Sequence, residues 1–348
     1  MSLTAGRYVA LILALCTGLL LASAALIYRY DPFEHYRQSA ILPTYSQESY
    51  HNPGIAKNYA YDAAILGTSM VEMSRPSTID AAFGVRSVKL PMRGSHTAQM
   101  GWQLSHILED REMKLVILAV DAYSLQGPPE DREEIVEYLW NDALLDDVNY
   151  LLNGDVLLVH LPRMLLNRGK SLAGQRDAMY QWVDVVFSEQ SVLQSTSFRS
   201  QGEMIPADTR QARTEENLRR HLIPAIEGHP QTRFLVYMPP YSAAYWYGVT
   251  RGGLFLQQAR TRELVAQALL GYENVELYDF SSRLEWIEDL DQYFDYSHHS
   301  TEISDRLIRA MAAGEGRLRD AAQMEEGTRR IEEAVERFAA RYEPASLR

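Results

Sequence analysis

The chain has a single cysteine, Cys16, among its 348 residues, so it cannot form an internal disulfide bond, and cysteine content gives no information about its compartment. It has no glycine-rich phosphate-binding loop, and its histidines and carboxylates do not occur at spacings typical of metal ligands. Basic residues are outnumbered, with 34 Lys and Arg against 46 Asp and Glu, which gives a formal net charge of -12. Such an acidic chain is poorly suited to nucleic acid, whose phosphates favour a basic surface. We therefore expect no nucleic-acid partner, no metal and no other cofactor.

Charged residues are also absent from one long stretch, YVALILALCTGLLLASAALIY, which runs from Tyr8 to Tyr28. A helix of this length can cross the roughly 30 Å hydrocarbon core of a bilayer, and tyrosines at its two ends suit the membrane interfaces. The alternative is a cleaved signal peptide, because the small residues Ala-Ser-Ala at 22–24 could form a cleavage site. The apolar run continues past that site, which favours an uncleaved anchor. We expect residues 1–28 to be a cytoplasmic leader and a single-pass anchor in the inner membrane, with the body on the periplasmic or external side.

After this segment, residues 29–60 are rich in proline, tyrosine and serine, and we interpret them as a stalk. Short apolar or alternating segments then recur between helical patterns, which is typical of strands and helices in alternation. The predicted strands cover residues 62–67, 85–91, 114–120, 233–239 and 274–280. This order predicts an α/β fold, a three-layer sandwich with a central parallel sheet of about five strands.

The regular alternation is interrupted at residues 126–210, which we interpret as an insertion or lid within a domain of residues 61–312. Inside the insertion, VLLVHLPRMLL at residues 156–166 fits two hypotheses. It could be a helix of the core, which we favour, or an amphipathic surface that meets a membrane or a partner. Residues 313–348 are predicted to form a charged amphipathic C-terminal helix.

Two segments far apart in the chain carry residues suited to nucleophilic catalysis. Ser69 follows the first predicted strand in the sequence AILGTSM, and Asp295 and His298 occur together in YFDYSHHS near the end of the domain. A serine hydroxyl becomes a good nucleophile when an imidazole accepts its proton and a carboxylate orients that imidazole. Ligands of parallel sheets bind at the carboxyl ends of the strands, which is where Ser69 is expected.

A strand that leads into Gly-Thr-Ser, with Asp-x-x-His near the domain's end, resembles the SGNH (GDSL-like) hydrolase and acyltransferase superfamily over about residues 60–312. The anchor makes the chain more similar to membrane-tethered members that act on cell-envelope polymers, such as alginate O-acetylation proteins and the D-alanine transfer protein. The resemblance implies that Ser69 is the nucleophile, His298 the base and Asp295 the orienting acid. It also implies that the N–H groups of Ser69 and Gly94 bind the oxyanion.

One family element differs, because the family's third block ends in Gly-x-Asn-Asp and its asparagine donates to the oxyanion. Here the third strand ends in LAVDAYSL, with Asp121 at that place, and an ionised carboxylate cannot donate a hydrogen bond. Either another group such as His96 replaces the asparagine, or backbone N–H groups alone form the hole, or the enzyme is weak. Asp121 itself is more typical of a helix cap than of a catalytic acid.

Three other features leave alternatives open. Tyr241 and Trp246, in YMPPYSAAYWY beyond the fourth strand, could stack on sugar rings or could belong to the core. His299 is expected to be a solvent-facing neighbour of His298, and the alternative is that it acts as the base. Asp121 and His96 are included with these aromatic residues as possible substrate-binding groups.

From these observations we expect a membrane-anchored serine enzyme that transfers acyl groups to, or removes them from, an envelope polysaccharide, with a multi-spanning membrane acyltransferase as a possible partner. The main alternative is a catalytically inactive glycan-binding or scaffolding subunit of the same fold. A metal-dependent hydrolase that uses Asp295, His298 and His299 is the third hypothesis.

Overall fold

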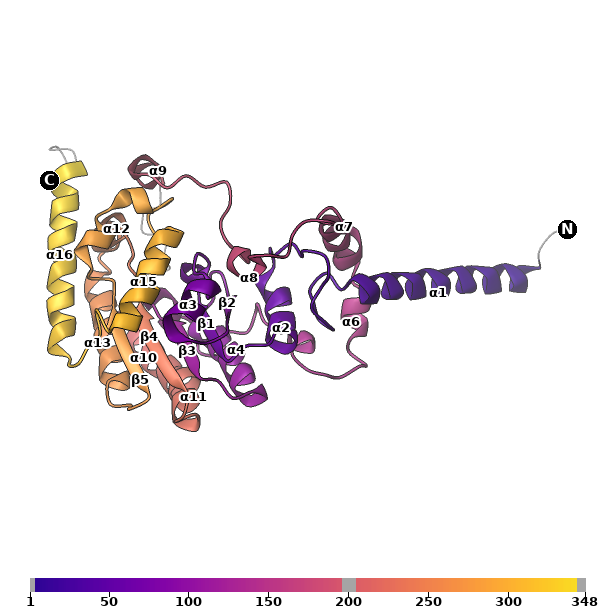
Figure 1. Ribbon diagram of the computed structural model, residues 1–348, viewed down its shortest axis with the longest axis horizontal. Coiled ribbons are helices and arrows are strands. Elements are labelled where there is room, and N and C mark those ends of the chain that lie inside the picture. The colour runs from indigo at the N-terminus through magenta and orange to yellow at the C-terminus, as the bar shows by residue number, and fades with distance from the viewer. Residues whose placement is uncertain (1–3, 196–204, 343–348) are drawn as a thin grey trace. The chain divides into compact units, whose positions relative to one another are not determined.

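The computed structural model describes residues 4–195 and 205–342, and its contacts divide the chain into two compact units (Figure 1). The first, here called the small unit, combines residues up to 59 with residues 135–175, and the second, the sheet unit, combines residues 60–134 with the chain from 176 onward. Helices and 3₁₀ or π turns of the small unit are α1 (Ala5–Tyr30), α2 (Glu48–Asn58), η2 (Glu137–Leu139), α6 (Val148–Leu151), η3 (Val156–His160) and α7 (Leu161–Leu165).

The sheet unit contains a five-stranded, wholly parallel sheet in the order β2-β1-β3-β4-β5. Its strands are β1 (Ala63–Gly67), β2 (Ser87–Pro91), β3 (Leu115–Ala119), β4 (Arg233–Met238) and β5 (Val275–Asp279). Its helices and helical turns are η1 (Ser69–Val71), α3 (Pro76–Phe83), α4 (Thr97–Asp110), α5 (Ala122–Leu125), α9 (Glu189–Gln194), α10 (Ala207–Asn217), η4 (Leu218–Leu222), α11 (Ile223–Gly228), α12 (Ala243–Arg251), α13 (Phe255–Leu269), α14 (Leu284–Ile287), η5 (Leu290–Gln292), α15 (Thr301–Ala313) and α16 (Ala322–Tyr342). A short helix, α8 (Gln175–Ala178), lies at the boundary of the two units. The predicted fold class and all five predicted strands are confirmed.

Helices cover both faces of the sheet, as the strand order requires. Ile65, Ile117 and Leu235 point to one face, where they form a core with side chains of α3 and α15. The chain first moves from β1 outward to β2 and then reverses toward β3, β4 and β5. Because parallel crossovers are right-handed, this reversal places α4 and α13 on the opposite face. It also creates a switch point between β1 and β3, where α/β sheets bind their ligands.

Strand β2 differs from the half-exposed strand that its alternating sequence suggests. All five of its residues are buried, and Lys89 is 0% exposed. The Lys89 Nζ donates to the carbonyl oxygens of Glu72 (2.6 Å), Ser74 (2.9 Å) and Asp177 (3.0 Å). Burial lowers the pKa of this ammonium to about 7. The lysine therefore ties the chain after Ser69 to β2 and α8.

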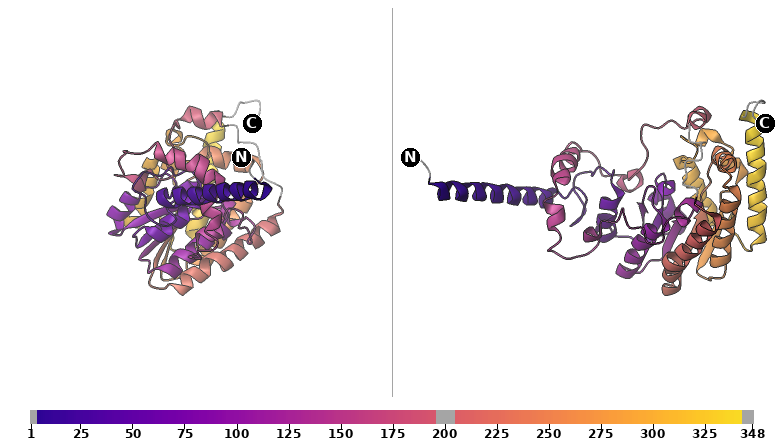
Figure 2. Two further views of the ribbon diagram at one scale, coloured as in Figure 1. Left: turned by 90° about the vertical axis from the view of Figure 1, so that its right-hand side faces the viewer. Right: turned by 180° about the vertical axis from the view of Figure 1, so that it is seen from behind.

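The predicted C-terminal helix is present as α16, an amphipathic helix that packs on α12 and α13 (Figure 2). Its buried face includes Ile331, Ala334 and Phe338, which join the core formed around Trp246 and Tyr293. The charged face carries intrahelical ion pairs between Arg and Glu side chains. This helix is thus part of the sheet unit and not a separate tail.

In the small unit, residues 29–59 are folded, which differs from the predicted stalk. Phe33 is 1% exposed and packs in a core with Ile27 of α1, Leu139, Tyr150 and Val156. These residues come from two distant parts of the sequence, so the predicted insertion at 126–210 is divided between the units. Its residues 135–175 complete the small unit, and the remainder belongs to the sheet unit.

The N-terminal helix α1 is long and apolar enough to cross a membrane, with a mean hydropathy of 2.5 over its most apolar window. Its 26 residues correspond to about 39 Å of helix. Most of its apolar side chains are exposed, as expected for a helix surrounded by lipid, whereas Ile27 near its end is fully buried in the small unit.

Candidate active site

Ser69 lies directly beyond the carboxyl end of β1, at the switch point of the sheet. The strand ends at Gly67, where a Cβ atom would approach the side chains of Ala119 and Val71 to 2.8 Å, so only glycine fits there. Thr68 then caps the turn η1 in an extended conformation, and Ser69 is its first residue. The backbone N–H of a first helical residue has no partner within the helix and is free to bind an acceptor. The fold thus presents both the hydroxyl and the N–H of Ser69 at the sheet's edge.

The structure brings Ser69, His298 and Asp295 together as the sequence predicts. The Ser69 Oγ lies 2.8 Å from Nε2 of His298, and Nδ1 of the same ring lies 2.7 Å from Oδ2 of Asp295. The other carboxylate oxygen, Oδ1, accepts the backbone N–H groups of Ser297 (2.7 Å) and His298 (2.8 Å). Burial acts to raise the pKa of Asp295, but its hydrogen bonds and the imidazole lower it below the usual value. Asp295 is therefore held as a carboxylate that fixes the orientation of His298.

The loop that carries Asp295 and His298 is held in place from α12. The Ser242 hydroxyl, which caps α12, donates to the carbonyl oxygen of Tyr296 (2.5 Å). The ring of Tyr296 lies parallel to that of Tyr245, with centroids 6.1 Å apart, and Tyr245 in turn stacks on Tyr241 at 4.2 Å. Since these rings pack on one another and on the loop, they support the position of the Asp295–His298 pair.

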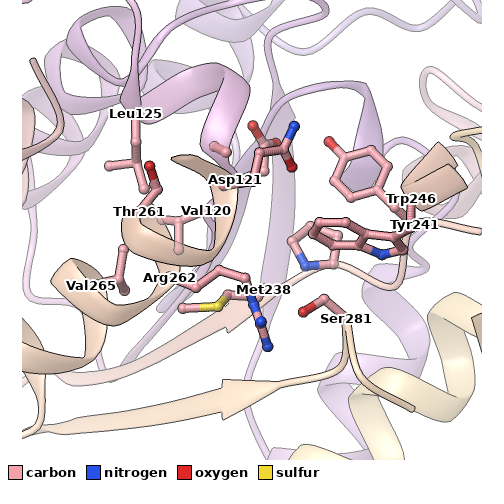
Figure 3. Close-up of a pocket in the computed structure, with 13 residues that line it drawn as sticks. Val120, Asp121, Leu125, Met238, Tyr241, Trp246, Thr261, Arg262, Val265 and Ser281 are labelled. Atoms are coloured by element: carbon pink, nitrogen blue, oxygen red, sulfur yellow. The ribbon is translucent and has the colours of Figure 1, made fainter. Parts of the chain in front are cut away.

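Of the two possible sugar-binding residues, Trp246 is buried and Tyr241 is partly buried against the same core. Trp246 is 3% exposed and lies in the core beneath α16. The two residues line a small, partly open cavity of about 20 Å³, together with Asp121 and Arg262 (Figure 3). A cavity of this size holds about one water molecule and no sugar ring. Trp246 and its neighbours therefore correspond to the core alternative.

Two aromatic rings that the sequence did not single out enclose the His298 imidazole. Phe294 stacks on it nearly in parallel, with centroids 5.2 Å apart and an interplanar angle of 6°. Trp182, from the insertion, lies 5.3 Å away and also contacts Phe294. The guanidinium of Arg93 lies 4.6 Å from the centre of the Trp182 ring and pairs with Glu72. These contacts restrict rotation of the imidazole and cover part of it from solvent.

Gly94 is exposed in the loop after β2 and has a φ of +68°, a conformation that favours glycine. Its carbonyl oxygen accepts a hydrogen bond from the hydroxyl of Tyr123 (3.1 Å), which fixes the orientation of this peptide. Within the described part of the chain, no hydrogen bond uses the N–H of Gly94 or of Ser69. Both N–H groups are therefore available as oxyanion donors.

Asp121 caps α5, and both of its carboxylate oxygens accept hydrogen bonds from neighbouring residues. Its Oδ1 accepts the N–H of Ser124 (2.8 Å), and its Oδ2 accepts the hydroxyl of Thr68 (3.4 Å). Burial raises the pKa of the Asp121 carboxyl, while hydrogen bonds from Ser124, Tyr241 and Thr68 act against that rise. Asp121 therefore links the ends of β3 and β1, next to Ser69.

His96 caps α4, and its Nδ1 lies 2.6 Å from Oδ2 of Asp131. The ring fills the space beside Gly127, where any Cβ atom would overlap it. The imidazole is thus held by Asp131 and packs against Gly127. Of the groups considered as oxyanion donors, the N–H groups of Ser69 and Gly94 are uncommitted within the described residues, whereas the His96 ring is engaged by Asp131.

His299 is buried, 2% exposed, and the expectation that it faces solvent is wrong. Its Nδ1 lies 3.2 Å from the carbonyl oxygen of Ser300 and 3.4 Å from the Ser304 hydroxyl, and burial lowers its pKa to about 4. His298, which contacts Ser69 directly, is the better base. Among the residues that the structure describes, no group of three or more His, Cys, Asp or Glu side chains is arranged to hold a metal ion.

Comparisons of the chain with protein-family models, with curated proteins and with solved structures found no match. The case for a function therefore depends on the residues and on the geometry described above.

Proposed function

We propose that this protein is a membrane-anchored serine acyl-ester enzyme that acts outside the cytoplasm. The observation that carries the proposal is the continuous hydrogen-bonded chain from Ser69 through His298 to Asp295, with distances of 2.8 and 2.7 Å. Nucleophile, base and orienting acid within hydrogen-bond reach are the arrangement required for acyl transfer through a serine ester.

In the proposed reaction, Ser69 Oγ attacks the carbonyl carbon of an ester while Nε2 of His298 takes the hydroxyl proton. The negative charge on the carbonyl oxygen is bound by the N–H groups of Ser69 and Gly94. The bond to the leaving alcohol then breaks, and His298 returns the proton to that alcohol, which leaves an acyl-serine. In the second half, His298 takes a proton from an acceptor hydroxyl, whose oxygen attacks the acyl carbon. The bond from the acyl carbon to Ser69 Oγ then breaks, and His298 returns the proton to Oγ.

The acceptor in the second half is a sugar hydroxyl of a cell-envelope polysaccharide in transfer, or water in hydrolysis. An anchor such as α1 keeps the enzyme at the membrane, which suits an acyl donor delivered by a multi-spanning membrane acyltransferase. The resemblance to tethered SGNH-type envelope enzymes supports the same reading, with acetyl as the group transferred.

The test uses the full-length protein in detergent with p-nitrophenyl acetate as substrate and a fluorophosphonate probe as a label. Ser69→Ala should lower turnover by at least about 10³-fold and abolish labelling, because it removes the nucleophile of a triad. Ser105→Ala is the control, since the Ser105 hydroxyl only bonds within its own helix, to the carbonyl oxygen of Trp102. Equal labelling of the Ser69→Ala protein and the native protein would exclude Ser69 from the mechanism.

Transfer and hydrolysis are separated by supplying oligosaccharide acceptors and following their acetylation by mass spectrometry. Release of acetate without acetylated oligosaccharide would identify a hydrolase.

A second function, a catalytically inactive scaffold or glycan-binding subunit, is favoured by one observation. Asp121 stands where the resembling family has an oxyanion-binding asparagine, and its oxygens already accept hydrogen bonds from Ser124 and Thr68. A scaffold should restore polysaccharide modification in a deletion strain even when Ser69 is replaced by alanine, whereas an enzyme should not.

A further inference from the structure

We propose that the small unit has a second membrane contact besides α1: a lipid-facing surface formed by the leucines around α6, η3 and α7. This lipid surface is defined here by Leu144, Leu145, Leu158 and Leu166. The proposal depends on α1 as an anchor and is independent of the triad.

The leucines of the lipid surface are unusually exposed for large aliphatic side chains. Leu144 is 83% exposed, Leu145 93%, Leu158 75% and Leu166 81%. Single exposed leucines are common on protein surfaces, but a group of them within one small unit marks an interaction site. Val148 and Leu152, at the ends of α6, extend the same apolar region with about half of their surface exposed.

Leu158 lies in η3, Leu144 and Leu145 lie in the turn before α6, and Leu166 follows α7, which packs on η3. Both α6 and η3 pack against α1, and Ile27 of α1 shares a core with Tyr150 of α6 and Val156 of η3 (Figure 1). If α1 spans the hydrocarbon core over the residues before Ile27, the elements that touch Ile27 lie at the level of the interface. Side chains that project from them then reach the lipid headgroups and the first part of the acyl chains.

The helix formed by η3 and α7, residues 156–165, is apolar on two sides. Val156, Leu161 and Met164 are buried toward the core of the small unit. Leu158 lies on the exposed side, and Leu166 directly follows the helix. One side of this helix thus packs in the core of the small unit, and the other side carries the exposed leucine on which the membrane proposal depends.

The charges near this helix favour lipid over a protein partner. Arg163, Arg168 and Lys170 are exposed, and no acidic residue occurs from Val156 to Gln175, whereas Leu144 and Leu145 lie between Asp142 and Asp146. Apolar side chains flanked by basic ones are typical of helices that lie in the interface of membranes with anionic lipids. The structure therefore assigns a bilayer with anionic headgroups as the occupant of the lipid surface.

The test places a fluorescent probe at Leu158→Cys or Leu166→Cys in the full-length protein, in a Cys16→Ser background that removes the only native cysteine. The proteins are reconstituted alone into vesicles of phosphatidylethanolamine and phosphatidylglycerol that contain lipids with a nitroxide quencher near the headgroup. Leu20→Cys, exposed on α1, is the positive control, and Glu332→Cys, exposed on the charged face of α16, is the negative control. Circular dichroism confirms that each variant is folded.

We expect lipid quenching at positions 158 and 166 to be at least threefold stronger than at position 332. Quenching equal to that at position 332 would overturn the proposal. The proposal would also be overturned if the probes at positions 158 and 166 were shielded from aqueous iodide in native membranes but not in the lipid vesicles. That result would identify a membrane-protein partner as the occupant. The quenching should be the same with Ser69→Ala, so loss of catalysis and loss of lipid contact are distinguishable.

Discussion

Replacing Asp295 by asparagine tests the proposed role of its two oxygens more sharply than removing the side chain. In the native protein Oδ1 accepts two backbone N–H groups while Oδ2 accepts from the imidazole. An asparagine has one acceptor oxygen and one donor NH₂ group. If its oxygen keeps both backbone hydrogen bonds, its NH₂ faces Nδ1 of His298, and the ring proton must move to Nε2. The imidazole then donates toward Ser69 and can no longer accept its proton.

The size of the loss in kcat can be worked out from the hydrogen bonds that the asparagine can keep. In the opposite orientation of the asparagine side-chain amide at position 295, its NH₂ would face the two backbone N–H groups. Both backbone hydrogen bonds would then be lost, and each contributes about 1 kcal/mol. The unproductive orientation is therefore favoured by about 2 kcal/mol, or a factor of about 30 in population. Loss of the carboxylate charge that stabilises the imidazolium adds to this. We expect a total loss of about 10³- to 10⁴-fold in kcat, the size of effect that this substitution has in serine protease triads.

The assay compares Asp295→Asn with Asp291→Asn, a carboxylate four residues earlier that accepts the N–H of Glu189 at the surface. Turnover of p-nitrophenyl acetate and the rate of fluorophosphonate labelling report on catalysis, and nitrogen-15 NMR reports which ring nitrogen of His298 carries the proton. Activity of Asp295→Asn within tenfold of the native protein, with the proton still on Nδ1, would refute the reasoning.

Three further predictions concern residues around the triad. Burial lowers the pKa of His299 from its usual 6.5 to about 4, so as pH falls the unfolded chain binds a proton at this ring before the folded chain does. The free energy of unfolding should therefore drop by about 3 kcal/mol between pH 6.5 and 4. His299→Gln should flatten that pH dependence when it is measured by urea unfolding. Trp182→Ala should lower kcat about tenfold because it frees the His298 ring, whereas Trp182→Phe should keep most activity; equal kcat values for the two would contradict the packing role. Lys89→Met leaves three carbonyl oxygens without their donor and should lower the free energy of unfolding in urea by about 3 kcal/mol. The control, Lys114→Met, should lower it by less than about 1 kcal/mol, because the ion pair of Lys114 with Asp62 is at the surface.

The sheet and the place of Ser69 at its edge could be predicted from the sequence because both depend on regular rules. The meeting of Ser69 with His298, which lies 229 positions later, was expected from the family resemblance and not from a local pattern. Buried parallel strands are short apolar runs bounded by turn residues, and their carboxyl ends meet at one edge. Gly67 marks the end of β1, so the residues after it were expected at that edge. Asp295 and His298 are close in sequence, which makes their contact with one another nearly local.

The remaining features depend on contacts that leave no local pattern. Trp182 reaches His298 from an irregular segment, where neither helical nor strand periodicity gives its position. Lys89 occupies an interior strand position because three carbonyl oxygens converge there, and only the fold brings them together. The small unit was missed for the same reason, since His35 pairs with Asp147 (2.9 Å) across 112 positions of the chain.

The discontinuous origin of the small unit limits how the protein can be shortened. Asp31, directly after α1, accepts the hydroxyl of Tyr150 (2.9 Å) and the backbone N–H groups of His35 and Tyr36 (2.9 and 2.8 Å). A version that starts at residue 60, chosen to obtain soluble protein, would remove these partners while retaining residues 135–175, and the bared aliphatic surface would promote aggregation. A soluble form should instead begin near residue 25, so that Ile27 and Phe33 keep their packing and only the exposed apolar part of α1 is lost.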